Sequence, residues 1–374
     1  MRQKQIYRTP IRQKEILSYV REKIWAGEWK PMEQLPPRVW FEKHFHAAVG
    51  TVQKAFQILI DQGLIVTNGR NGSSVAANLP HLSRFALVSE LGEPGSFMLG
   101  QSILKSVEIL KKELELDLRF FNVRIATERE SWERISPELE ALIRERLIAG
   151  ILMTTPTLLF DSEEFRKQKK IPGFILSDID LGLNRISADW SGFWKQMVKT
   201  AALRNAQNVA VFHPSWLPDP SWEKLFHGYC AEFGLTCRQE HCLELCSLYH
   251  PTYAGNIARL MFSADRTEYP DTLLVGDDNF LPHIQSALRE RFGEEAPRKI
   301  RIISHANFPL TYQTDWPVCF IGMNLLRVIL DFVRETVRII HGKPPRPLAM
   351  EYCEEYEFSI QNEINQYKSK GGSE

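Results

Sequence analysis

The sequence predicts an α/β protein with a small, mainly helical domain at its N-terminus and a larger domain of two α/β lobes behind it. The length of 374 residues exceeds one typical domain and suits two. Residues 1–80 hold six Lys and six Arg against five Glu and one Asp, a net charge of +6, so the remainder carries −6. From Arg84 onward, short β-rich runs alternate with amphipathic helical stretches. These observations place a boundary near residue 80 and make the first module basic, as nucleic-acid-binding modules are.

The composition is that of an ordinary globular protein, with 44% hydrophobic residues, 25% charged residues and a mean hydropathy of −0.26. No apolar run approaches the roughly 18 residues that a membrane span needs. Residues 1–7 are polar and basic and no apolar stretch follows them, so no secretory signal is expected. We therefore expect a cytoplasmic protein that does not bind a membrane and whose six cysteines stay reduced.

Three helices are expected in the first 62 residues. The stretch 9–27 begins with Thr-Pro, an N-cap hydroxyl followed by a first-turn proline, and its apolar residues recur at helical spacing up to a glycine. A second, short helix opens at the Pro-Pro pair 36–37 and ends before a tight turn at 46–48. The third runs over 49–62 with one apolar stripe and stops at Gly63.

Residues 64–67 and 73–76 are expected to form two short strands around the turn-rich tip 68–72. Three helices followed by a basic hairpin are the winged helix-turn-helix plan, in which the third helix enters the major groove of DNA N-terminus first. Its free polar face and the wing tip then reach phosphates and base edges. The candidate DNA-binding residues are Arg38, Gly50, Thr51, Gln53, Lys54, Gln57, Arg70, Asn71 and Gly72. The alternative is a protein-interaction module with a solvated polar face.

This segment resembles the DNA-binding domain of GntR-type regulators over about 70 residues, in the right order. The residues that carry the resemblance are Ala26-Gly27, Lys30-Pro31, Leu35-Pro36, Thr51-Val52, Ala55-Phe56, Gly63-Leu64-Ile65 and the wing 70–75. Two positions depart from the family pattern. Val39 stands where the family usually has an arginine, and Ala48-Val49 replaces a Ser-Arg pair at the start of the third helix. The resemblance implies DNA binding with either unusual specificity or reduced affinity.

The remaining three hundred residues alternate between strand and helix patterns, which indicates parallel sheets with crossover helices. Expected strands are 85–88, 118–123, 150–153, 174–176, 208–212, 272–275 and 300–303. Expected helices are 98–114, 137–147, 192–204, 222–233, 280–292 and a long final helix at about 320–341. This many strands predicts two α/β lobes, and in such folds ligands lie at the carboxyl ends of the strands.

Neither a catalytic nor a metal site is expected. The sequence contains no GxSxG, Walker, HExxH or strand-following GxGxxG motif, so we expect no enzyme and no cofactor. Asp277 and Asp278 are adjacent, and in a strand they would point to opposite faces rather than form an acid/base pair. The run Cys237, His241, Cys242, Cys246, His250 has zinc-ligand residue types without a CxxC pair, and we expect no metal there.

The second domain resembles the effector domain of LacI-type regulators, a relative of periplasmic sugar-binding proteins. The landmarks are Ile186 to Gly192, His227-Gly228-Tyr229, Phe233-Gly234-Leu235, Pro270 to Asp278, Ile300 to Asn307, Leu310-Thr311, Gly322 and Gly342-Lys343-Pro344. They follow family order over nearly the whole of 84–360. The resemblance implies a two-lobed, periplasmic-binding-protein-like sensor domain with a ligand held between its lobes.

That resemblance places the ligand site in loops after the strands. The candidate ligand-binding residues are Ser89, Glu90, Phe97, Ser177, Asp178, His213, Trp216, Asp278, His305 and Asn307. Carboxylates and amides bind sugar hydroxyls, and aromatic faces pack on sugar C–H groups, so a monosaccharide or small glycoside is expected. For Asp278 the alternative role is a helix N-cap, and for Trp216 it is packing of its loop.

The sequence thus predicts four segments: a winged helix-turn-helix domain at 1–76, a linker at 77–83, a two-lobed effector domain at 84–360 and a polar tail at 361–374. The expected function is a DNA-binding transcription regulator, a repressor acting as a homodimer, whose affinity for its operator responds to a small ligand. The alternatives are a solute-binding protein or a partner-binding sensor without DNA binding.

Overall fold

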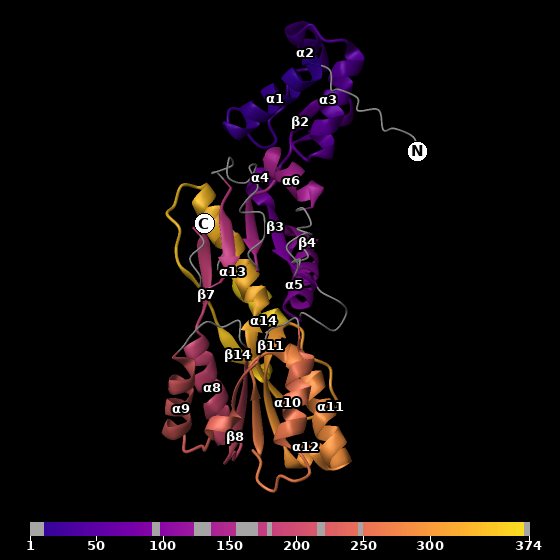
Figure 1. Ribbon diagram of the computed structural model, residues 1–374. Helices are drawn as coiled ribbons and strands as arrows, with labels where there is room; N and C mark the ends of the chain where they lie inside the picture. The colour runs from indigo at the N-terminus through magenta and orange to yellow at the C-terminus, as the bar shows by residue number, and fades with distance from the viewer. Residues whose placement is uncertain are drawn as a thin grey trace, which may run out of the picture.

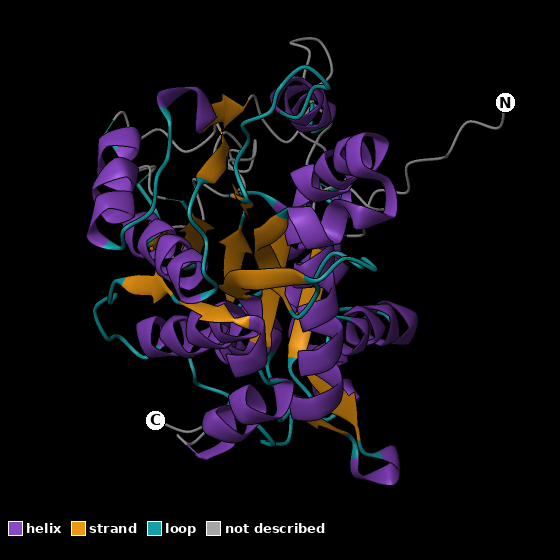
Figure 2. Ribbon diagram, turned by 90° about the horizontal axis from the view of Figure 1, so that it is seen from below, coloured by secondary structure: helices purple, strands orange, loops and turns teal. Residues whose placement is uncertain are grey.

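The computed structural model describes residues 11–91, 98–122, 136–154, 171–177, 182–214, 221–245 and 250–369. Three parts follow one another along the molecule: a helical N-terminal domain, a first α/β lobe and a second α/β lobe (Figure 1). Figure 2 shows strands in the interior and helices around them. No helix in the described ranges is long and apolar enough to cross a membrane.

The N-terminal domain has the predicted three helices and hairpin. Its elements are α1 (Ile11–Trp25), α2 (Arg38–Phe45), α3 (Val49–Asp61), β1 (Ile65–Thr67) and β2 (Ser73–Val75). The strands pair antiparallel, and Gln34 adds an isolated bridge to Ser74. The apolar stripes of the three helices meet in one core, where Ile16, Val20 and Phe41 are fully buried. The periodicity therefore predicted this domain because its helices bury one face each.

The segment between this domain and the first lobe is short and packed. Residues 80–83 form the single-turn helix α4 (Pro80–Ser83), and the chain enters the first lobe directly at Arg84. Leu79 belongs to the core of the N-terminal domain and is 3% exposed. Burial lowers the pKa of His81, in α4, to about 4, so its ring is neutral at pH 7.

The first lobe is built on a six-stranded, wholly parallel sheet in the order β13-β7-β6-β5-β3-β4. Its strands are β3 (Arg84–Ser89), β4 (Asp117–Asn122), β5 (Gly150–Met153), β6 (Gly173–Leu176), β7 (Asn184–Ala188) and β13 (Leu348–Met350). Its helices are α5 (Met98–Leu114), α6 (Pro137–Arg144) and α13 (Leu325–Ile340). The apolar face of α13 packs with α5 against one face of the sheet.

The second lobe has a sheet in the order β14-β12-β11-β10-β8-β9, parallel except for β14. Its strands are β8 (Val209–Pro214), β9 (Cys242–Leu245), β10 (Thr272–Val275), β11 (Arg301–Phe308), β12 (Val318–Asn324) and β14 (Tyr352–Glu354). Its helices are α8 (Trp190–Leu203), α9 (Trp222–Glu232), α10 (Thr252–Met261), α11 (Leu281–Phe292) and α12 (Ala296–Lys299), with the short turn η4 (Asp278–Phe280). Helices α8 and α9 cover one face, and α10 and α11 the other.

The chain passes between the lobes after β7, after β12 and after β13, and after β14 it returns to the first lobe, where Tyr367 packs against the core. Because β7, β12 and β13 are parallel members of their sheets and each leaves its lobe at its carboxyl end, the carboxyl edges of both sheets face the junction between the lobes. The lobes also touch directly, since the Met98 backbone N–H donates to Asn279 Oδ1 at 3.2 Å. The loops expected to bind ligand therefore lie at this junction.

Two expectations near the C-terminus are wrong. The helix predicted at 320–341 begins only at Leu325, because residues 318–324 form β12, which is buried on both faces and so shows no alternation. Gly322 lies in that strand, not in a helix. Residues 361–369, the described part of the segment expected to be a polar tail, belong to the helix α14 (Ile360–Ser369). Ile364 is buried there, and Arg334 of α13 lies over Tyr367.

Candidate nucleic-acid interface and ligand site

The predicted DNA-reading face of α3 is on the surface of the molecule. Gly50, Gln53, Lys54 and Gln57 are exposed, and Thr51 is half-buried. The opposite stripe, with Val52 and Phe56, fills the core. The helix begins after Ala48, whose side chain offers no capping hydrogen bond. This leaves the first turn open to an anionic partner.

The two departures from the family pattern are exposed as well. Val39 is 55% exposed and Val49 is 65% exposed. Valine side chains are more often buried, and neither of these two belongs to the core of the domain. Arg38 lies beside Val39, and its guanidinium carbon is 5.3 Å from the centre of the Phe56 ring. The first turns of α2 and α3 therefore present valine side chains at the surface.

Hydrogen bonds to backbone groups fix the shape of the wing tip. Asn71 carbonyl oxygen accepts a hydrogen bond from Gln34 Nε2 at 2.7 Å, and the Asn68 N–H donates to the Gly72 carbonyl at 2.8 Å. Gly72 has φ 84° and ψ −142°, a conformation that suits glycine and strains other residues. Arg70, Asn71 and Gly72 are exposed, so the tip carries an exposed guanidinium on a turn of fixed shape.

The N-terminal domain packs on the first lobe. Arg21 of α1 forms an ion pair with Glu145, just after α6. The Arg146 guanidinium carbon lies 5.0 Å from the centre of the Trp25 ring. Leu147 is 4% exposed and belongs to the core of the N-terminal domain. The end of α6 thus joins the two domains through packing and charge.

Three predicted ligand residues of the second lobe come together at the junction. Asp278 follows β10 and is fully buried, and both its carboxylate oxygens accept hydrogen bonds from Asn307 Nδ2, at 3.2 and 3.0 Å. His305 Nδ1 lies 3.9 Å from Asp278 Oδ1. His305 and Asn307 are two residues apart in β11, so both side chains leave the same face of the sheet.

Polar atoms of this cluster are buried without a hydrogen bond. Within the described part of the chain, both ring nitrogens of His305 and Asn307 Oδ1 have none, although the two residues are only 4% and 3% exposed. Unsatisfied buried polar atoms are costly and mark places where a ligand or water binds. A molecule with several hydroxyl groups would satisfy them.

A second buried carboxylate adjoins the first. Asp277 is not in a strand; it caps η4 by accepting from the Asn279 N–H at 2.9 Å and from Asn279 Nδ2 at 2.7 Å. Burial, and then the charge of Asp278, raise the pKa of Asp277 to about 6. The helix-cap role considered for Asp278 thus belongs to Asp277, and the Asp278 carboxylate accepts hydrogen bonds from Asn307 instead.

His213 occupies a different environment. It is the second-last residue of β8 and is 1% exposed. Its ring stacks between two indoles, at 3.9 Å and 13° from Trp222 and at 5.3 Å and 28° from Trp194. A Cβ on Gly276 would come within 2.5 Å of the Trp194 ring, so a glycine is needed there for the stack to fit. His213 therefore lies in an aromatic cluster at the same sheet edge as Asp278.

The first lobe contributes hydroxyl and carboxyl groups at its own sheet edge. Ser89 Oγ accepts a hydrogen bond from Thr154 Oγ1 at 2.7 Å, which joins the ends of β3 and β5. Glu90 and Ser177 are half-buried at the ends of β3 and β6. Phe97, Asp178 and Trp216, also expected in the site, lie outside the described residues.

Thr154, Asp277 and Asn279 also lie at the junction between the lobes, although they are not among the ligand-binding residues predicted from the sequence. Thr154 directly follows a strand that was predicted, as Ser89 does, so the same criterion would have found it. Asn279 could not be predicted from the sequence, because it joins the lobes by accepting a hydrogen bond from Met98, which is distant in the sequence. Only the packing of the two lobes reveals it.

Comparison with known proteins supports both domain assignments. Residues 12–75 match the family described as bacterial regulatory proteins, gntR family. No curated protein matches the chain. Among solved structures, the transcription regulator CcpA of Lactococcus lactis has a TM-score of 0.53 at 15% identity, over 74% of this chain and 98% of that one. A LacI family transcriptional regulator from Arthrobacter sp. FB24, in complex with lactose, has 0.53 at 15% identity, over 73% and 98%.

A regulatory protein of the LacI family from Chloroflexus aggregans has a TM-score of 0.51 at 15% identity, over 72% and 96% of the two chains. At such identities the likeness establishes the fold. Both resemblances expected from the sequence are thereby confirmed. The chain carries a DNA-binding domain of the gntR family of bacterial regulatory proteins at residues 12–75, joined to two lobes that share the fold of LacI-family transcription regulators.

Proposed function

We propose that this protein is a ligand-responsive transcription regulator that binds DNA through α3 and the wing and binds a small polyhydroxylated ligand, a monosaccharide or glycoside, between its lobes. The observation that carries the proposal is the gntR-family match at residues 12–75 together with the exposed polar face of α3. The net charge of +6 over residues 1–80 favours an anionic partner. Lys54 and Arg70 supply phosphate contacts, and Gln53 and Gln57 reach base edges.

The chemistry of the junction favours a sugar. Its buried groups include the Asp278 carboxylate and Asn307 Oδ1, which are hydrogen-bond acceptors, and the His305 ring, which offers both a donor and an acceptor. Hydroxyl groups of a sugar donate to such acceptors with charge-assisted strength and accept from imidazole N–H. One of the solved structures of the same fold holds lactose. Within the described ranges Asp278 pairs with no Lys or Arg, and its one ion-pair contact is His305 Nδ1 at 3.9 Å, so a neutral hydroxylated ligand suits it better than an anion.

The contact between the domains supplies a route for regulation. A ligand that favours one arrangement of the lobes shifts the population toward it. The first lobe carries the end of α6, where Glu145 and Arg146 contact α1 of the DNA-binding domain. Movement of the first lobe would therefore also move the DNA-binding domain, which packs on that lobe. We infer a homodimer, because one winged helix makes few base contacts and two half-sites multiply affinity.

The first test is selection of genomic fragments by the purified full-length protein at moderate salt, followed by sequencing. A sharply enriched region with a two-fold symmetric site is the expected result, and in a repressor it would overlap a promoter. Absence of enrichment, both with and without a panel of sugars, would contradict DNA reading. It would favour a partner-binding sensor, a role consistent with the exposed Val39 and Val49 at the surface of α2 and α3.

A further inference from the structure

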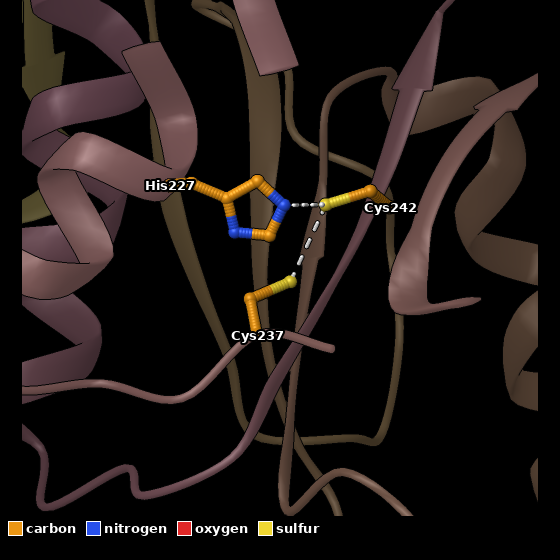
Figure 3. Close-up of side chains that lie close together, drawn as sticks. All are labelled: His227, Cys237 and Cys242. Carbon is orange, nitrogen blue, oxygen red and sulfur yellow. Dashed lines mark hydrogen bonds between the residues drawn. The ribbon is translucent and has the colours of Figure 1, made fainter. Parts of the chain in front are cut away.

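A thiol–imidazole cluster lies in the second lobe, apart from the groups assigned to DNA and ligand (Figure 3). His227 projects from α9, Cys237 follows that helix, and Cys242 is the first residue of the edge strand β9. Their ligand atoms all lie within 4.8 Å of one another. The sequence run that suggested zinc ligands contained the two cysteines but not His227, which packing of α9 beside β9 brings to them.

Two of the three distances between ligand atoms are close to those of a metal site, and the third, from Cys237 Sγ to the His227 ring, is within 4.8 Å. Cys237 Sγ lies 3.5 Å from Cys242 Sγ, and Cys242 Sγ lies 3.4 Å from His227 Nε2. Zinc bonds of about 2.3 Å to sulfur and about 2.0–2.1 Å to nitrogen, at tetrahedral angles, place sulfur atoms about 3.8 Å apart and sulfur and nitrogen about 3.6 Å apart. In a trigonal-planar site the sulfur atoms would be about 4.0 Å apart, which fits less well.

We propose that His227, Cys237 and Cys242 bind one zinc ion in tetrahedral geometry. Glu223 is one turn before His227 on α9, and its Oε1 lies 3.9 Å from His227 Nε2, so a change of its side-chain rotamer would bring it to the fourth position. Gln239 donates a hydrogen bond to that same oxygen and orients it. Two thiolates, an imidazole and a carboxylate are ligands that zinc accepts.

Zinc binds the thiolate form of cysteine, so binding at this cluster would release the thiol protons. The affinity for the ion should therefore rise with pH.

The ion would tie α9 to the edge strand β9. Helix α9 begins at Trp222, which stacks on His213 at the carboxyl end of β8. The metal would therefore fix the helix that shapes the aromatic cluster beside the ligand junction. The proposed zinc site does not depend on DNA binding, so a negative result in its test would not count against the proposed regulator function.

The test is a titration of the full-length, reduced and chelator-treated protein with Co²⁺, which replaces zinc and absorbs strongly when thiolates bind it. We expect one equivalent of Co²⁺ to produce a thiolate-to-cobalt charge-transfer band, which one equivalent of Zn²⁺ then abolishes. Cys242→Ser should lose the band and weaken zinc binding at least about 100-fold. Cys353→Ser is the matched control, since Cys353 is a half-buried thiol in β14, at the opposite edge of the same sheet, and it should behave as the native protein.

Circular dichroism verifies that the variants are folded, and His227→Gln provides a second variant should Cys242→Ser unfold. The proposal is overturned when the native protein shows no charge-transfer band, or when Cys242→Ser and His227→Gln bind Co²⁺ as tightly as Cys353→Ser does. A mass lower by two hydrogens under reducing conditions would also overturn it, because Cys237 and Cys242 would then form a disulfide.

Discussion

At the scale of single residues, the two proposed binding surfaces rely on opposite physical effects. Lys54 and Arg70 act from exposed positions, where charge attracts phosphate over a distance and salt screens the attraction. Asp278 acts from a fully buried position, where each hydrogen bond is strong and each missing one is costly. Substitutions at the two places should therefore leave different signatures.

Lys54→Ala should weaken binding to all DNA sequences alike and lower the salt dependence. Loss of one phosphate contact reduces the slope of log affinity against log salt by about 0.9. Fluorescence anisotropy at several salt concentrations measures it. Lys105→Ala, at an exposed position of α5 in the first lobe, is the control and should keep the native slope. If log affinity falls with log salt at the same slope in Lys54→Ala and in the native protein, Lys54 does not contact a DNA phosphate.

Asp278→Asn keeps the shape of the side chain and removes its charge. We expect affinity for the effector sugar to fall about 10–100-fold, since charge-assisted hydrogen bonds contribute about 1.5–3 kcal/mol. The pKa of Asp277 should fall at the same time, because the Asp278 charge is one cause of its elevation. Isothermal titration calorimetry measures the affinity, with the exposed Asp315→Asn as control. A sugar that binds both variants equally does not contact Asp278.

At the scale of secondary structure, the sheets depend on close approach of their strands. Gly322 in β12 faces Ala306 in β11, and a Cβ on Gly322 would come within 2.2 Å of the Ala306 carbonyl oxygen. The backbone therefore requires a glycine at this position. The family landmark at Gly322 thus has a packing cause, although it lies in a strand rather than in the predicted helix.

Gly322→Ala should destabilise the protein by about 1–3 kcal/mol through overpacking. Urea unfolding measures it. Gly228→Ala is the matched control: Gly228 is an exposed helical glycine with nothing within 4 Å of a Cβ, so alanine should be neutral or stabilise by up to about 1 kcal/mol. Equal stabilities of the two variants would mean that β11 and β12 can separate at little cost.

The helices and strands that could be predicted are those whose apolar residues recur with a clear period within the segment itself. Helix α5 was predicted at its observed bounds, Met98–Leu114, because one face is apolar over four turns. Strands β9 and β12 were missed because short or doubly buried apolar segments have no diagnostic period. Helix α10 was missed although its buried residues Ala254, Ala258 and Met261 recur at helical spacing. The position of Asp278 at the carboxyl end of β10 could be predicted because it follows a recognisable strand. The meeting of His227 with Cys242 could not, since it depends on how a helix packs on an edge strand.

At the scale of the whole molecule, the contact at the end of α6 is where a change in the lobes would reach the DNA-binding domain. Arg146 has φ 51°, a conformation that asparagine tolerates, and its guanidinium lies over Trp25. A substitution there can remove the contact without straining the turn.

Arg146→Asn should keep DNA affinity without effector within about threefold but reduce the effector-induced change, because the coupling free energy depends on contacts that differ between the two states. DNA affinity with and without sugar measures this ratio. Arg298→Asn is the control, since the Arg298 side chain is 80% exposed in the second lobe. A native ratio in Arg146→Asn would show that coupling runs through another route.

The central claim is that a sugar at Asp278 and DNA at α3 are coupled in one molecule. The most direct measurement is the dissociation constant for the selected DNA fragment, with and without saturating sugar, in the native protein and in Asp278→Asn. We predict a change of about 5–150-fold in the native protein, the usual range of allosteric coupling, and a much smaller change in Asp278→Asn at the same sugar concentration. Equal constants with and without every sugar that binds the native protein would contradict the account.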